Sequence, residues 1–173
     1  MNIELKNSVF LGSSGSGRNY VILTTILSLV NEINSIVISE SDDSFNFIAT
    51  KLSQEGINAS VKNLKNIDLE PKTLVITNSE SEARILLEND KVFVWYKASD
   101  LTTFIKQFPQ KIIGYLSEAD RLNALEILSI DTSKFMLHKA NGHGTSYLIE
   151  NDQKQEFIKL NVDREIFSKY SEV

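Results

Sequence analysis

Short runs of hydrophobic residues alternate along the chain with longer stretches in which hydrophobic residues recur every three or four positions. Short apolar runs are typical of buried strands, and the longer spacing is typical of helices with one buried face. The predicted strands are 7–11, 35–39, 74–77, 92–96, 111–115, 145–150 and 155–160. The predicted helices are 18–33, 42–54, 80–87, 101–107 and 117–128.

This order of elements predicts an α/β fold. Strands that alternate with helices form a mostly parallel sheet covered by helices on both faces. Asn151 and Asp152 lie in the short connection between the last two predicted strands, so we expect a C-terminal hairpin that extends the sheet at one edge. No linker or internal repeat divides the chain, and we therefore expect a single domain over residues 1–173.

A glycine-rich turn follows the first predicted strand, where ligands bind in sheets of this kind. It reads Gly12-Ser13-Ser14-Gly15-Ser16-Gly17-Arg18-Asn19. The spacing of Gly12 and Gly17, between a strand and a helix, is typical of phosphate-binding loops, whose backbone N–H groups surround an anion. However, Arg18 stands at the lysine position of such a loop, and Asn19 stands where a Ser or Thr hydroxyl would bind Mg²⁺. The sequence therefore predicts a vestigial nucleotide-binding loop.

A hydrolysing site also needs a carboxylate at the end of a buried strand, to hold the metal and polarise water. The best strand for this is 74–77, and the expected positions are Thr77, Asn78 and Ser79. None of these is an acid, while Glu80 and Glu82 suit the first turn of the next helix. We therefore assign no catalytic residue and predict that hydrolysis is lost.

Two other kinds of site are less well supported. A dinucleotide-binding G-x-G-x-x-G motif would need a glycine where the chain has Tyr20. Asp42 and Asp43 follow the second strand near the position of a ribose contact, but are better explained as the opening of the next helix. His138 and His143 lack a nearby third ligand, so we predict loop residues and no metal site.

Composition narrows the class of protein further. The chain has no cysteine, which excludes Cys-ligated metal, thiol catalysis and disulfides. Hydrophobic residues make up 42% and charged residues 24%, which is typical of a globular domain. The formal charge of −5 disfavours a surface that binds nucleic acid over a large area.

With these motifs in place, the chain resembles an FtsK/SpoIIIE-type ATPase domain. Residues 9–18 are similar to the phosphate loop of that family, and 92–100 to its sensor strand, which makes Lys97 and Ser99 sensor-like. Residues 111–115 with Asp120-Arg121, and 141–148, are similar to later segments. The resemblance implies a three-layer P-loop NTPase of the RecA/FtsK type, with a mostly parallel sheet and a C-terminal β-hairpin.

Within that family, the chain is most similar to the degenerate last ATPase domain of type VII secretion coupling proteins, the EccC/EssC group. This implies a non-hydrolysing cytoplasmic domain of a longer, membrane-anchored chain, which regulates the motor and helps to recognise export substrates. The implied partners are neighbouring ATPase domains and small helical export substrates, with a hexamer possible for the whole protein and no nucleic acid. No cofactor is expected beyond weak binding of ATP and Mg²⁺. The alternative is an active Mg-ATP-hydrolysing FtsK-like motor for secretion or DNA translocation.

Overall fold

The computed structural model describes residues 3–13, 17–129, 146–151, 154–159 and 168–170. Its strands are β1 (Ser8–Leu11), β2 (Ser35–Ser39), β3 (Ala59–Lys62), β4 (Thr73–Thr77), β5 (Val92–Ala98), β6 (Gln110–Ile113), β7 (Ser146–Asn151) and β8 (Lys154–Lys159). Its α-helices are α1 (Arg18–Leu29), α2 (Phe47–Gln54), α3 (Glu80–Leu86) and α4 (Glu118–Leu128), and its 3₁₀ helices are η1 (Val30–Glu32) and η2 (Thr103–Gln107).

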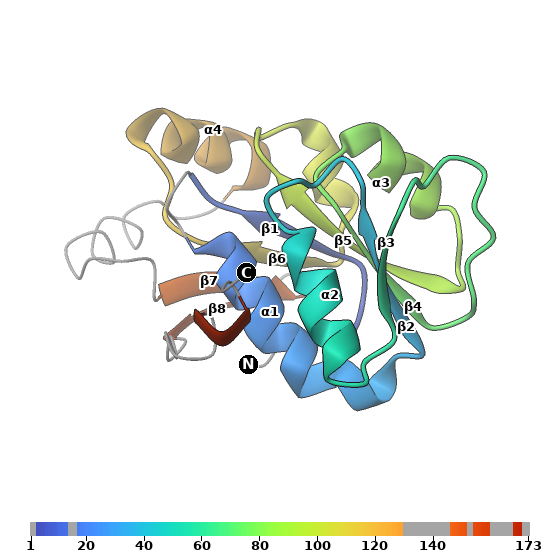
Figure 1. Ribbon diagram of the computed structural model, residues 1–173. Coiled ribbons are helices and arrows are strands. Elements are labelled where there is room, and N and C mark those ends of the chain that lie inside the picture. Colours follow the sequence, from blue (N-terminus) through green and yellow to red (C-terminus); the bar gives the residue numbers. More distant parts are fainter. Residues whose placement is uncertain (1–2, 14–16, 130–145, 152–153, 160–167, 171–173) are drawn as a thin grey trace.

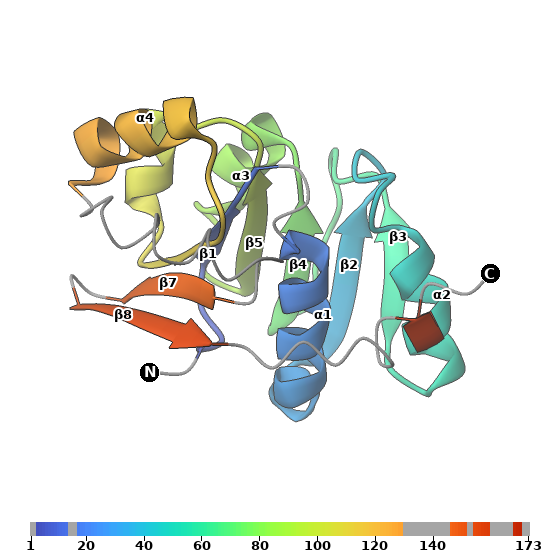
Figure 2. The same ribbon diagram turned by 90° about the vertical axis from the view of Figure 1, so that its left-hand side faces the viewer.

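The described strands form one eight-stranded sheet in the order β3-β2-β4-β5-β1-β6-β7-β8 (Figure 2). From β3 to β6 all neighbouring strands are parallel. Strand β7 runs antiparallel to β6, and β8 antiparallel to β7. The predicted α/β fold and the hairpin at one edge of the sheet are therefore confirmed.

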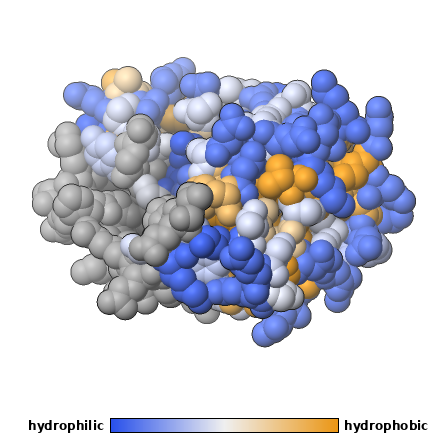
Figure 3. All heavy atoms as spheres, viewed as in Figure 1, coloured by the Kyte–Doolittle hydropathy of each residue, from blue (hydrophilic) through white to orange (hydrophobic). Residues whose placement is uncertain are grey.

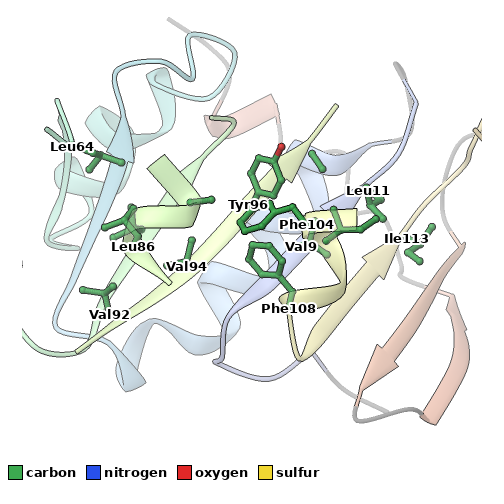
Figure 4. Packing of buried hydrophobic residues seen from close by; sticks show 14 of the residues in the cluster. Val9, Leu11, Leu64, Leu86, Val92, Val94, Tyr96, Phe104, Phe108 and Ile113 are labelled. Carbon is green, nitrogen blue, oxygen red and sulfur yellow. The ribbon is translucent and has the colours of Figure 1, made fainter. Parts of the chain in front are cut away.

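Helices cover both faces of the sheet (Figure 1), because the parallel strands carry apolar side chains on both faces. On one face, α1 and α2 pack on a cluster that includes Trp95, whose ring centroid lies 5.3 Å from that of Phe10. On the other face, α3, α4 and η2 pack on a cluster that includes Tyr96. Figure 4 shows the rings of Tyr96, Phe104 and Phe108 gathered in this second cluster. The side chains of Trp95 and Tyr96, consecutive residues of β5, thus pack on opposite faces of the sheet in a three-layer fold.

Several elements differ from the sequence-based predictions. The pattern did not predict β3, a half-exposed edge strand. The first predicted helix divides into α1 and η1, and the helix predicted over 101–107 is the 3₁₀ helix η2. Helix α2 begins at Phe47 and not at Asp42, so the prediction that Asp42 and Asp43 open this helix is wrong.

Residues 168–170 are held against α2 by side chains. Tyr170 is buried in the cluster beneath α1 and α2, and its hydroxyl donates a hydrogen bond to Glu55. Lys169 Nζ lies 2.5 Å from the other carboxylate oxygen of Glu55. Burial, followed by the hydrogen bond to Glu55 and its charge, raises the pKa of Tyr170 to about 12.

We expect Tyr170 to make the stability of the fold depend on alkaline pH. An unfolded tyrosine ionises at a pKa of about 10, whereas the folded Tyr170 keeps its proton up to a pKa of about 12. The stability that neutral Tyr170 contributes is therefore complete below the unfolded pKa and is lost as pH rises through the folded pKa. Urea unfolding over this pH range should show a steeper loss for the natural chain than for Tyr170→Phe. Parallel curves for the two proteins would contradict the assignment.

Candidate functional site

Strands β1 and β5 are neighbours in the sheet, and the chain leaves their carboxyl ends toward opposite faces. The chain leaves β1 for α1 on one face of the sheet and leaves β5 for η2 on the other face. Ligands in open α/β sheets bind where adjacent strands diverge in this way. The glycine-rich turn is therefore located at the ligand-binding edge of the sheet, as the sequence predicts.

Both ends of the glycine-rich turn are held in place. Gly12 is buried after β1, and the backbone N–H of Ser13 donates to the carbonyl of Tyr115 at 2.8 Å. Ser13 Oγ donates to Asp120 at 3.1 Å and accepts from the backbone N–H of Ser117 at 2.8 Å, which connects the turn to the start of α4. At the other end, Gly17 has a φ of 81°, a left-handed conformation that favours glycine, and it precedes the first residue of α1. Ser14, Gly15 and Ser16 lie outside the described residues.

Arg18, the residue at the lysine position, reaches across to β5. Its guanidinium donates to the carbonyl oxygen of Ala98 at the end of that strand. Burial lowers the pKa of Arg18, and the nearby Asp42 carboxylate partly offsets this effect. The next residue, Asn19, donates its side-chain amide to the carbonyl of Ser44 at 3.2 Å. The two altered positions of the loop thus contact the end of β5 and the turn after β2.

Lys97 and Asp42 form a buried ion pair beside Arg18. Lys97 Nζ lies 2.7 Å from each carboxylate oxygen of Asp42 and 3.1 Å from Ser44 Oγ, so all three ammonium protons have acceptors. The side chains of Lys97 and Asp42 are 4% and 0% exposed. Burial lowers the pKa of Lys97, and the hydrogen bond with Asp42 opposes this shift.

This ion pair changes two sequence-based assignments. The carboxylate of Asp42 is occupied by Lys97, which argues against the ribose contact of a dinucleotide site. Lys97, predicted as sensor-like, is at the site but is paired. Ser99 is exposed, and its hydroxyl donates to Asp100 at 3.3 Å. The structure therefore does not bring Ser99 together with Lys97 and Arg18 through any described hydrogen bond.

A carboxylate does lie at the end of β4, and it belongs to a residue of helix α3. Glu82, in the first turn of α3, accepts hydrogen bonds from the hydroxyls of Thr77, Ser39 and Ser41. Asn78 is exposed and accepts from Ser41, whereas Ser79 caps α3. The sequence signal for this arrangement is the S-x-x-E spacing of Ser79 and Glu82, in which Ser79 Oγ accepts from the backbone N–H of Glu82. That signal places Glu82 in the first turn, but it does not show that the carboxylate reaches back to the sheet.

No metal-binding cluster is present in the described ranges, where no group of three or more His, Cys, Asp or Glu residues could hold an ion. His138 and His143 fall outside these ranges. Among the helices of the described segments, none is long and apolar enough to cross a membrane.

Comparison with known proteins identifies the fold. No protein-family model matches the sequence, and no curated protein sequence matches it. The genome packaging NTPase B204 of Sulfolobus turreted icosahedral virus 2, in complex with AMPPCP, is 18% identical with a TM-score of 0.62, over 92% of this chain and 100% of that chain. A second B204 structure, described as the DNA-packaging ATPase from Sulfolobus turreted icosahedral virus, is 13% identical with a TM-score of 0.62, over 90% and 98%.

A third neighbour is the pCW3 conjugation coupling protein TcpA with ATPγS. It is 13% identical with a TM-score of 0.55, and the match covers 96% of this chain and 64% of that chain. At these identities the likeness shows the fold alone. The chain has the α/β fold of P-loop NTPases, as these neighbours do, whereas the narrower likeness to the EccC/EssC group stays a prediction.

Proposed function

We propose that this chain is the P-loop domain of a translocation motor, which binds a nucleoside triphosphate at residues 12–19 but does not hydrolyse it. The proposal is supported by the fold, which is similar to proteins described as a genome packaging NTPase and a conjugation coupling protein, both with ATP analogues. The observation that supports the loss of hydrolysis is the identity of three residues at the site. Arg18, Asn19 and Thr77 stand at the three positions that need a lysine, a hydroxyl and a carboxylate, and each contacts protein groups.

Nucleotide binding and phosphate release test this proposal together. A ligand at a hundred times its dissociation constant stabilises the folded state by about 2.7 kcal/mol, which raises the melting temperature by roughly 5–10 °C. We expect such a rise with ATP, together with phosphate release no faster than in protein-free buffer. Absence of any rise would contradict nucleotide binding, and release above the blank would contradict the loss of hydrolysis.

The second candidate is an active Mg-ATPase, which is favoured by the position of Glu82. Its carboxylate lies at the end of β4, where the second motif of a hydrolysing site supplies an acid. If this candidate is correct, Mg-dependent phosphate release should be present in the natural chain and lost in Glu82→Gln. Glu80→Gln is the matched control, because Glu80 is in the same helical turn but pairs with Arg84. Equal rates in all three proteins, at the level of the blank, would exclude this candidate.

A narrower form of the proposal is the type VII role: the last ATPase domain of a longer, membrane-anchored coupling protein, which faces the cytoplasm and assembles as a hexamer. Its support is the altered loop and second motif, together with the charge of −5, which suits handling of protein better than DNA. The side drawn in Figure 3 is mostly hydrophilic among its coloured atoms. However, Leu122 and Leu125 on α4 are 66% and 48% exposed, and such side chains favour contacts with an apolar helix. Saturable binding of a helical export signal would support this role, and lack of binding to the full-length protein would contradict it.

A further inference from the structure

The donor groups at the site do not fit Mg²⁺, the ion that P-loop hydrolysis requires. Mg²⁺ needs near-octahedral oxygen ligands, which hydrolysing sites supply from a loop hydroxyl and a strand-end carboxylate. Asn19 has no hydroxyl, and its amide nitrogen is bonded to Ser44. The Thr77 hydroxyl donates to Glu82, whose Oε2 also accepts from Ser39 and Ser41. That oxygen is already stabilised by the hydroxyl groups of Thr77 and Ser39 without a cation.

Two cationic side chains, Arg18 and Lys97, lie at the site. Lys97 forms an ion pair with Asp42, and Arg18 lies near the same carboxylate. The start of α1 adds to this field, because its first turn has no acid and its N-cap makes no side-chain hydrogen bond. Of the nearby acids, Glu80 is paired with Arg84, and Asp100 is exposed at the end of β5. The carboxylates of Glu82 and Asp120 accept hydrogen bonds from hydroxyl groups. Arg18 is therefore the cation at the site that no described ion pair neutralises.

Arg18 is the group that a phosphate would engage. Among the described residues, its hydrogen-bond partner is a neutral group, the carbonyl of Ala98. A guanidinium bonds a phosphate through two parallel, charge-assisted hydrogen bonds, which are stronger than a bond to a neutral oxygen. Lys97 is saturated by Asp42 and Ser44, so it contributes charge and no free donor.

We infer that the site binds the free, fully ionised form of a nucleoside triphosphate, and that Mg²⁺ opposes this binding. This inference rests on the proposed function. The physical reason is that Mg²⁺ neutralises part of the phosphate charge and occupies the oxygens that Arg18 and the start of α1 would bind, while the protein offers no ligands to the metal in return.

Calorimetric titration of the whole chain with ATP, in EDTA and in excess Mg²⁺ at equal ionic strength, tests the inference. We expect binding in Mg²⁺ to be weaker by roughly tenfold, the effect of losing one charge-assisted hydrogen bond. Arg18→Ala should weaken binding in EDTA by at least about tenfold, and Arg18→Lys should give an intermediate loss. Lys106→Ala is the matched control, since it removes one exposed positive charge from η2 and should leave both affinities unchanged.

The outcomes separate the inference from the function on which it rests. Binding that is equal in both buffers, or tighter in Mg²⁺, would overturn the inference and leave nucleotide binding intact. Binding in EDTA that is unaffected by Arg18→Ala would overturn the role given to Arg18, provided that the variant melts at the temperature of the natural chain. Absence of binding in both buffers would overturn the proposed function itself.

Discussion

Asp42→Ala should destabilise the fold by about 3–5 kcal/mol, the cost of leaving a buried charge without its partner. Asp42 supplies two of the three acceptors of the Lys97 ammonium, and both side chains are excluded from water. After the substitution, only Ser44 remains as a hydrogen-bond acceptor for Lys97. Lys97 must then lose its proton or draw water into the sheet, and both are costly. Urea unfolding at neutral pH measures the loss directly.

Two further variants separate the ion pair from a general effect of losing an acid. Asp43 is the exposed neighbour of Asp42, so Asp43→Ala should change stability by less than about 0.5 kcal/mol. The double variant Asp42→Leu with Lys97→Met replaces the pair by apolar side chains and should recover most of the loss. A cost below about 1 kcal/mol for Asp42→Ala would show that the pair contributes little.

Phe104→Ala should cost about 3–5 kcal/mol, the range for removing a buried aromatic side chain. The Phe104 ring lies 5.8 Å from Tyr96 and 5.3 Å from Phe108, measured between centroids, and the Arg84 guanidinium lies 4.2 Å from its centre. The 3₁₀ helix η2 has few backbone hydrogen bonds of its own, so these contacts hold it against the sheet. Thermal or urea unfolding should show the loss without a change in fold.

Ile85→Ala is the control on the same face of the sheet. Ile85, in the adjacent helix α3, is 71% exposed, and its truncation should change stability by less than about 0.5 kcal/mol. Equal effects of Phe104→Ala and Ile85→Ala would mean that the aromatic cluster does not stabilise this layer.

The sequence predicted the sheet well because its central strands are buried on both faces and read as continuous apolar runs. It did not predict β3 because an edge strand buries little and its residues, Ala59 to Lys62, lack a strong apolar signal. The start of α2 was wrong for a different reason. Asp42 has the residue type of a helix start, but a long-range ion pair with Lys97 holds it in a turn.

The candidate site was predictable where local sequence determines it. The glycine spacing correctly placed Gly12 directly after β1 and Gly17 directly before α1. Two other features depend on contacts between residues far apart in the chain: the pairing of Asp42 with Lys97, and the contact of Glu82 with Ser39 and Ser41. These contacts exist only because β2, β4 and β5 end at the same edge of the sheet, which residue spacing alone does not encode.

The burial of Trp95 provides a built-in spectroscopic reporter. Trp95 is the single tryptophan of the chain, and its indole nitrogen donates to the carbonyl of Lys6 at 3.1 Å. Indole fluorescence from this one buried position should shift to longer wavelength on unfolding, so each variant above can be followed without a label. Because Trp95 packs on Phe10, two residues before Gly12, a change in emission on addition of nucleotide would report movement transmitted from the loop into the sheet.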